Sequence, residues 1–230
     1  MGTDFARTAI EAFAERLRGQ VDMTVLGLRA RGLAPGEPYG MHLEVAAVAE
    51  AAGAGPAHLA GFSAGATVAL AAALALGDAV RSVALLEPAF IGDDDWDPAE
   101  ARWRAAIGSL GAASTAREVE AFRAMLMAPG ATPPPSRGPP AWDFRDDLLG
   151  SMLSAHTGFE SSDLAAIRAP VLLIRGGRST PRFGVVARRL MAVCPRASEH
   201  VFSTLHHFAP PYREQPEELA GLLLDLWGAA

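Results

Sequence analysis

The chain has 230 residues, enough to bury the core of one domain, and half of them are apolar. The net charge is −6 and every basic side chain is a scattered arginine, which argues against a nucleic-acid partner. Cys194 is the only cysteine, which excludes an intrachain disulfide and disfavours a cysteine-based metal site. We find neither a signal peptide nor a membrane span, so we expect a cytoplasmic protein with no membrane partner.

Helical and extended patterns alternate along the first 90 residues. Helices are expected in three segments, residues 5–18, 41–52 and 65–76. Short apolar runs typical of buried strands lie between or after them, at residues 21–28, 56–61 and 80–86. Strands that alternate with helices favour an α/β fold with a mainly parallel sheet flanked by helices.

The pattern changes after residue 90. An acidic stretch at residues 93–97 suits a helix N-terminus, and helical segments are expected at residues 98–110 and 115–127. Residues 129–140 hold too many prolines for regular structure. We interpret residues 91–160 as a helical lid insertion between two halves of the core, residues 1–90 and 161–230. The second half carries expected strands at 170–175 and 199–202 and helices at 181–193 and 214–227.

The strongest functional signal is Gly61-Phe62-Ser63-Ala64-Gly65, between a predicted strand and a predicted helix. Such a turn lifts the Ser63 hydroxyl above the sheet edge. It also aims the Ala64 amide where negative charge develops on a substrate carbonyl. We expect side chains in place of either glycine to collide with neighbouring backbone. The alternative is a tight turn with a helix-capping serine.

A serine nucleophile needs a general base within hydrogen-bond reach. Two adjacent histidines, His206 and His207, follow the last predicted strand. We predict His207 as the base and His206 as the less favoured choice, the alternative being that His207 only caps a loop. The remaining histidines lack a matching context; they are His42, His58, His156 and His200.

Several segments resemble the α/β-hydrolase family. Residues 202–210 and 215–218 are similar to its G-H-F-x-P … P-e-e ending, with His207 in the histidine position. Residues 24–32 resemble its v-x-x-D-L-R-x-x-G strand and turn, with Gly27 in place of the usual aspartate. Residues 169–176 resemble the strand before the usual acid. The resemblance covers most of the chain and implies that fold, with the N-terminal strands missing here.

The resemblance implies two positions for the acid of a catalytic triad. Ser179 holds the usual one, and a serine cannot stabilise an imidazolium by charge. Other members carry the acid at the end of the strand after the nucleophile helix, where this chain has Glu87. We therefore predict Glu87, with Asp95 and Asp94 as fallbacks. The alternative is that Glu87 is a solvated strand end or a helix cap.

Members of the family also have a loop, often His-Gly, upstream of the first helix seen here, which supplies a second oxyanion amide. No such motif precedes that helix, and the loss of one donor costs ~10²–10³ in turnover. Three accounts stay open: a second donor comes from Arg29, Arg31 or the 32–40 loop, the true start lies upstream, or the protein has abandoned hydrolysis. The missing strands would expose a sheet edge, which would permit a homo-oligomer.

These features predict a serine hydrolase that needs no cofactor or metal and acts on a small-molecule ester, thioester or lactone. The lid is rich in aromatic and methionine side chains, which either cover an apolar acyl pocket or form the lid's own core. They are Trp96, Trp103, Phe122, Met125, Met127, Trp142, Phe144 and Met152. One rival is a non-hydrolytic relative that binds an apolar ligand or partner subunit; another is an oligomeric scaffold.

Overall fold

The computed structural model describes residues 2–29, 37–93, 98–108, 116–135 and 157–228. Within these ranges, four parallel strands form one sheet in chain order: β1 (Ala57–Phe62), β2 (Val80–Leu86), β3 (Val171–Gly176) and β4 (Ala197–Phe202). All four strands were predicted to within three residues at each end. Since all the strands run the same way, their carboxyl ends meet at one edge of the sheet, and the loops that follow them lie there together.

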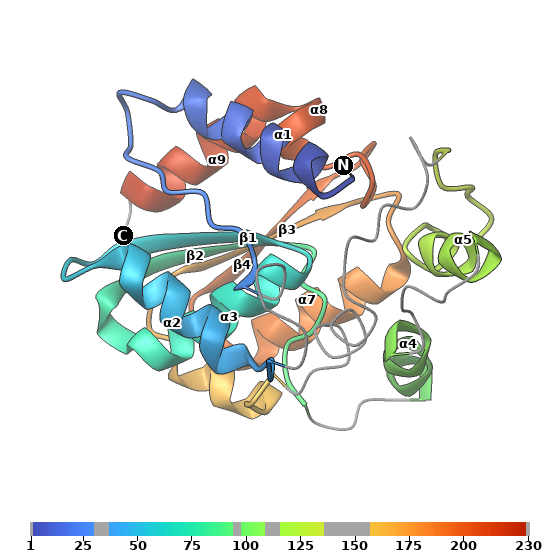
Figure 1. Cartoon of the computed structure of the whole chain (residues 1–230), viewed down its shortest axis with the longest axis horizontal. Helices are drawn as coiled ribbons and strands as arrows, with labels where there is room; N and C mark the ends of the chain where they lie inside the picture. Colours follow the sequence, from blue (N-terminus) through green and yellow to red (C-terminus); the bar gives the residue numbers. More distant parts are fainter. Residues whose placement is uncertain (1, 30–36, 94–97, 109–115, 136–156, 229–230) are drawn as a thin grey trace.

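Helices cover both faces of the sheet (Figure 1). One face carries α2 (Met41–Ala52), α3 (Ala64–Leu76), the 3₁₀ helix η3 (Ser161–Ala166) and α7 (Pro181–Val193). The opposite face carries α1 (Gly2–Arg16), the short α8 (Pro211–Glu214) and α9 (Pro216–Gly228). A single 3₁₀ turn, η2 (Gly77–Ala79), leads into β2. The predicted α/β class with a parallel sheet between helices is confirmed.

The central strands β2 and β3 are apolar on both sides because each side meets a helical layer. Val83, Leu85 and Leu173 pack with α3 and α7 in one buried cluster. Ala84 and Leu86 alternate with them and pack against α1 and α9 in a second cluster. The small side chains of α3 allow that helix to lie close to the sheet. This arrangement fixes the end of β1 and the start of α3, where Ser63 lies.

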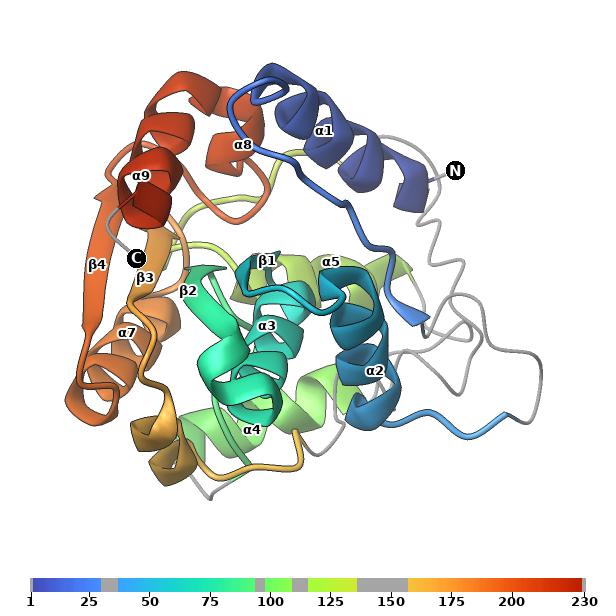
Figure 2. The same ribbon diagram turned by 90° about the vertical axis from the view of Figure 1, so that its left-hand side faces the viewer.

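The prediction of a strand at residues 21–28 is wrong. The segment is an extended coil that runs from α1 toward α2 (Figure 2), and within the described residues β1 pairs only with β2. Its apolar residues are used for packing instead: Val21 and Met23 contact the cluster beneath α1 and α9, while Leu26 is 45% exposed. Alternating apolar residues indicate an extended chain, but a strand also needs a hydrogen-bonded neighbour.

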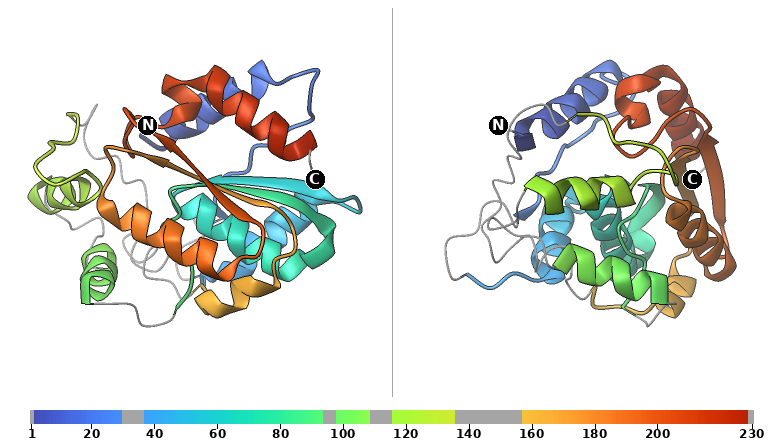
Figure 3. Two further views of the ribbon diagram at one scale, coloured as in Figure 1. Left: turned by 180° about the vertical axis from the view of Figure 1, so that it is seen from behind. Right: turned by 90° about the vertical axis from the view of Figure 1, so that its right-hand side faces the viewer.

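The segment between β2 and β3 packs at the carboxyl end of the sheet. Its described helices are α4 (Pro98–Gly108) and α5 (Ala116–Met125), which lie beyond the end of α7 (Figure 3). Trp103 and Phe122 are buried there against residues that follow β2 and β3. These two side chains are therefore part of a local core. Four other aromatic and methionine residues singled out from the sequence lie outside the described residues: Trp96, Trp142, Phe144 and Met152.

Asp93 joins the two ends of this segment by hydrogen bonds. Its carboxylate accepts hydrogen bonds from the backbone N–H groups of Thr157 and Gly158, at 2.6 and 2.9 Å. Its own N–H donates to the carbonyl oxygen of Phe159 at 2.9 Å. Residues that are more than 60 positions apart in the chain therefore meet where the segment leaves the core and where it returns. Within the part of the chain that the structure describes, no helix is long and apolar enough to cross a membrane.

Only Ser63 separates β1 from α3, and this tight turn depends on Gly61. A Cβ atom at Gly61 would lie 2.2 Å from the carbonyl oxygen of Gly65. A Cβ atom at Gly65 would meet nothing within 4 Å among the described residues. The expected steric requirement for glycine therefore holds at Gly61 and is wrong at Gly65, whose added atom would face open space beside the first turn of α3.

We expect Gly61→Ala to lower the free energy of unfolding by more than the roughly 1–3 kcal/mol usual for overpacking, because the collision is with backbone. Gly65→Ala is the matched control. It should be neutral or should stabilise α3, since alanine is favoured over glycine in a helix by about 1 kcal/mol. Urea denaturation of both variants measures the difference, and equal midpoints would contradict this account.

Candidate active site

Ser63 occupies a strained turn at the carboxyl end of β1. Its φ of 55° lies in the left-handed region, which costs a residue with a side chain on the order of 1–3 kcal/mol. The turn is held by the Ser63 N–H, which donates to Leu86 at 2.9 Å, and by the Ser63 carbonyl, which accepts from Ala89 at 3.2 Å. The first N–H groups of a helix have no partner within it, so the Ala64 amide is available beside the serine.

Glu87 follows β2 and is also strained, with a φ of 47°. Its side chain is buried, and both carboxylate oxygens are engaged. Oε1 accepts a hydrogen bond from the Gly176 N–H at 2.8 Å, and Oε2 lies 2.7 Å from Nδ1 of His207. Ser63 and Glu87 are the two residues other than glycine with positive φ in the described part of the chain. Backbone strain thus gathers at the two positions predicted to be nucleophile and acid.

The imidazole of His207 is held on several sides. It stacks on Phe62 with ring centroids 4.8 Å apart and on Phe183 with centroids 5.4 Å apart and planes 8° from parallel. Phe208 meets its edge. Because Nδ1 faces Glu87, Nε2 is the nitrogen left for another partner. Phe62 precedes Ser63 directly, so the imidazole lies beside the strained turn.

Ser63, Glu87 and His207 thus come from the carboxyl ends of β1, β2 and β4. The structure places Glu87 and His207 in direct contact. No hydrogen bond between Ser63 and His207 is present among the described residues. Catalytic hydrogen bonds are often long in unliganded enzymes and shorten in the substrate complex. The triad stays a prediction.

The other candidates lie elsewhere or have other partners. The Ser179 hydroxyl is buried and has no hydrogen-bond partner in the described structure, and Asp94, Asp95 and Arg31 lie outside the described residues. Nδ1 of His206 accepts a hydrogen bond from the Phe208 N–H, and burial lowers the pKa of His206. The Arg29 guanidinium pairs with Glu50 at 3.2 Å in an exposed contact, and its role as a second oxyanion donor stays a prediction.

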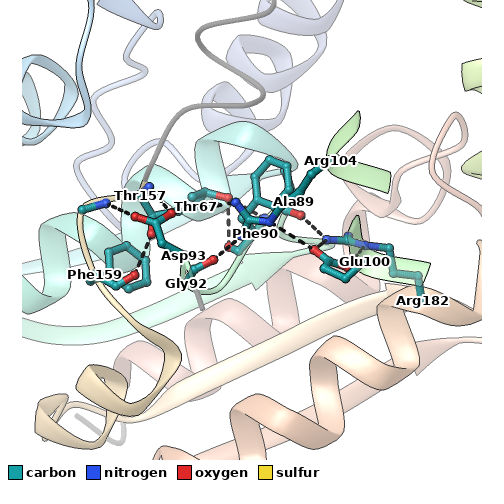
Figure 4. A network of polar contacts seen from close by, with 11 residues as sticks. Thr67, Ala89, Phe90, Gly92, Asp93, Glu100, Arg104, Thr157, Phe159 and Arg182 are labelled. Atoms are coloured by element: carbon teal, nitrogen blue, oxygen red, sulfur yellow. Dashed lines mark hydrogen bonds and ion pairs between the residues drawn. The ribbon is translucent and has the colours of Figure 1, made fainter. Parts of the chain in front are cut away.

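A buried network of charged side chains lies next to this site (Figure 4), and the sequence analysis did not predict it. Arg182 follows the first residue of α7. Its Nε and Nη2 donate to both carboxylate oxygens of Glu100 on α4, at 2.8 and 2.7 Å, and Nη2 also donates to the Ala89 carbonyl at 2.6 Å. Trp103 covers the guanidinium at 4.5 Å. Arg182 therefore joins α4, α7 and the backbone that contacts Ser63.

The network continues toward the base of the β2–β3 segment. Arg104 lies 4.4 Å from the Phe90 ring, donates to the Gly92 carbonyl and pairs with Asp93 at 3.8 Å. A sequence signal for Arg182 existed. A cation in the first turn of a helix opposes the helix dipole, and such a local conflict often marks a position fixed by tertiary contacts.

Within the described ranges, no group of three or more His, Cys, Asp or Glu side chains could hold a metal ion.

Residues 2–222 match the model of the Alpha/beta hydrolase family. No curated protein matches the chain.

Several solved structures share the fold at low identity. NosK from Streptomyces actuosus is 18% identical over 96% of this chain and 92% of its own, with a TM-score of 0.64. An N-formylmaleamic acid deformylase from Pseudomonas putida S16 is 19% identical over 94% of this chain and 86% of its own, with a TM-score of 0.56. The carboxylesterase CesB from Bacillus subtilis is 16% identical over 83% and 67%, with a TM-score of 0.51.

We expect Arg182→Met to destabilise the protein by about 3 kcal/mol, the lower end of the range for breaking a buried ion pair. The carboxylate of Glu100 then loses both of its hydrogen bonds to Arg182, while the Nε of Arg104 stays 4.0 Å away. The double variant Arg182→Met/Glu100→Leu should recover much of that loss, because no uncompensated charge stays buried.

The control is Arg16→Met, which breaks the exposed pair with Glu217 and should cost about 0–1 kcal/mol. Urea denaturation of the four proteins measures these differences. If Arg182→Met costs no more than Arg16→Met, the buried pair does not hold α4 on the core.

Proposed function

Because the chain belongs to the alpha/beta hydrolase family, we propose that it is a serine hydrolase that cleaves an ester-type bond of a small molecule. The observation that carries the proposal is the buried 2.7 Å contact between Glu87 and His207, next to the strained Ser63. Burying a carboxylate is costly unless it is paired. A pair that leaves Nε2 of the histidine available, at the sheet edge that also carries a serine at a helix N-terminus, suits nucleophilic catalysis.

In the proposed reaction, Oγ of Ser63 attacks the carbonyl carbon while Nε2 of His207 accepts the hydroxyl proton. The carbonyl oxygen becomes negative and receives a hydrogen bond from the Ala64 N–H. When this tetrahedral intermediate collapses, His207 returns the proton to the leaving alcohol or thiol, and an acyl-Ser63 ester remains. Water, deprotonated by His207, then hydrolyses that ester and regenerates the serine.

Glu87 acts through His207. Its Oε2 accepts the Nδ1 proton, which fixes the tautomer that leaves Nε2 as a proton acceptor and stabilises the imidazolium formed during the reaction. The Gly176 N–H holds the other carboxylate oxygen, so the acid is oriented before substrate arrives. No metal or organic cofactor is needed for this chemistry.

Two features favour a rival, a non-hydrolytic relative that binds an apolar ligand or partner subunit in the same place. No hydrogen bond joins Ser63 to His207 in the described structure, and the Ala64 amide is the one oxyanion donor that we assign. With a single donor, turnover about 10²–10³ below that of a complete site is expected. The two functions differ in whether Ser63 is reactive.

A fluorophosphonate probe tests that reactivity. We expect the wild-type protein to be labelled and Ser63→Ala to remain unlabelled, because the probe captures an activated serine. Ser179→Ala is the control, since the Ser179 hydroxyl is buried and has no hydrogen-bond partner in the described structure, and this variant should be labelled normally. Intact-protein mass spectrometry measures the adduct. A well-folded wild-type protein that stays unlabelled would favour the rival function.

We expect Glu87→Gln to reduce kcat for p-nitrophenyl acetate by up to about 10⁴, the effect of replacing the acid of a serine triad by its amide. The uncharged amide neither fixes the tautomer nor stabilises the imidazolium. Glu217→Gln, a change to an exposed glutamate, serves as the control and should leave kcat unchanged. Steady-state kinetics and circular dichroism separate a catalytic loss from unfolding. Comparable kcat values for the two variants would remove Glu87 from the mechanism.

A further inference from the structure

A small pocket lies next to the strained turn, on the side of α2 and α3. Eight residues line it: Leu28, Tyr39, Met41, Ala64, Thr67, Val68, Ala89 and Phe90. Two of them flank Ser63 directly, since Ala64 follows it in the chain and the Ala89 N–H donates to its carbonyl oxygen. A group attached to the carbon that Ser63 attacks, with its oxygen on the Ala64 amide, can therefore enter this pocket.

The pocket offers an apolar surface. Thr67 is its one polar residue on α3, and its hydroxyl accepts from the Phe90 N–H at 3.0 Å and donates to the Phe90 carbonyl at 3.1 Å. The Tyr39 hydroxyl is engaged with Glu44. None of the lining side chains is charged. A carboxylate or ammonium group on the acyl chain would lose its water there without gaining an ionic partner.

The pocket is also small. As the described residues form it, its free space admits roughly one water-sized group. The methyl group of an acetyl chain matches this size, and we expect longer chains to fit progressively less well.

One wall is fixed by a buried carboxylate that takes no part in the proposed chemistry. Glu44, on the first turn of α2, is 2% exposed. It accepts hydrogen bonds from the Arg29 N–H at 2.9 Å and from the Tyr39 hydroxyl. Burial and the negative charge of Glu44 raise the pKa of Tyr39, so its hydroxyl stays a donor. The carboxylate thereby holds both the segment that carries Leu28 and the side chain of Tyr39 in place.

The opposite wall is held by the charged network. The two hydrogen bonds from Thr67 fix the Phe90 backbone, and Arg182 fixes the Ala89 carbonyl (Figure 4). Both walls are thus anchored by polar groups that lie behind the apolar surface. A pocket built in this way resists widening when a longer chain enters.

We propose that this pocket holds the acyl group of the substrate and restricts it to short, uncharged alkanoyl chains, with Leu28, Tyr39 and Met41 setting the length limit. The inference rests on the proposed serine hydrolase function and names its substrate class. The leaving group is not restricted by this pocket.

The test uses the full chain and p-nitrophenyl esters of acetate, butyrate and octanoate, which share one leaving group. We expect kcat/KM to fall at least about tenfold from acetate to octanoate, since a single misplaced methylene can cost that much. Met41→Ala and Leu28→Ala remove side-chain volume from the wall. Each should raise the octanoate-to-acetate ratio about tenfold or more.

Leu26→Ala is the matched control, because Leu26 lies in the same segment but is exposed and does not line the pocket. It should leave the ratio unchanged. Glu44→Gln should also raise the ratio while preserving the reaction with the fluorophosphonate probe, because it loosens the wall and leaves the serine intact.

A wild-type preference for octanoate, or an unchanged ratio in both Met41→Ala and Leu28→Ala, would overturn the pocket assignment while labelling of Ser63 still supports the hydrolase. A folded protein that is neither labelled nor active on any ester would overturn both. Using two wall variants keeps the test decisive if one of them fails to fold.

Discussion

The buried carboxylate of Glu87 is the constraint on which the candidate site depends. One of its oxygens binds the Gly176 N–H at the end of β3, and the other contacts His207 in the loop after β4. These partners are 89 and 120 positions away in the chain. An unpaired buried carboxylate costs several kcal/mol, so the ends of three strands must meet correctly for the charge to be tolerated. Fold and site are therefore stabilised by the same contact.

The strain at Ser63 and Glu87 is offset by backbone hydrogen bonds that continue the sheet beyond its strands. The Ser63 N–H donates to Leu86 at 2.9 Å, and the Glu87 N–H donates to Ile174 at 3.0 Å. Each residue can therefore turn sharply away while its amide stays paired with the neighbouring strand. The charged network of Arg182 stabilises the next stretch, residues 89–93, in a different way, with side chains from α4 and α7.

The local sequence was sufficient to predict a feature when the residues that determine it lie together in one segment. The small residues around Ser63 predicted the turn, whereas Glu87 was predicted from the resemblance, which implies an acid at the end of this strand. The error at residues 21–28 has the opposite origin, because strand formation depends on a neighbour that the segment itself does not specify. Arg182 was missed for a similar reason: its partner Glu100 is 82 positions away, and no local pattern pairs them.

Ser63 and His207 are not hydrogen-bonded in the described structure, and of these two side chains the serine is the less restrained. The imidazole is held by Glu87 at Nδ1 and lies between the rings of Phe62 and Phe183, so rotating it would break the hydrogen bond and the stacking together. The Ser63 hydroxyl has only the χ1 torsion to change, and the side chain is partly exposed. If His207 is the base of Ser63, we expect the serine hydroxyl rather than the imidazole to be the group that turns, because the imidazole has more contacts to lose.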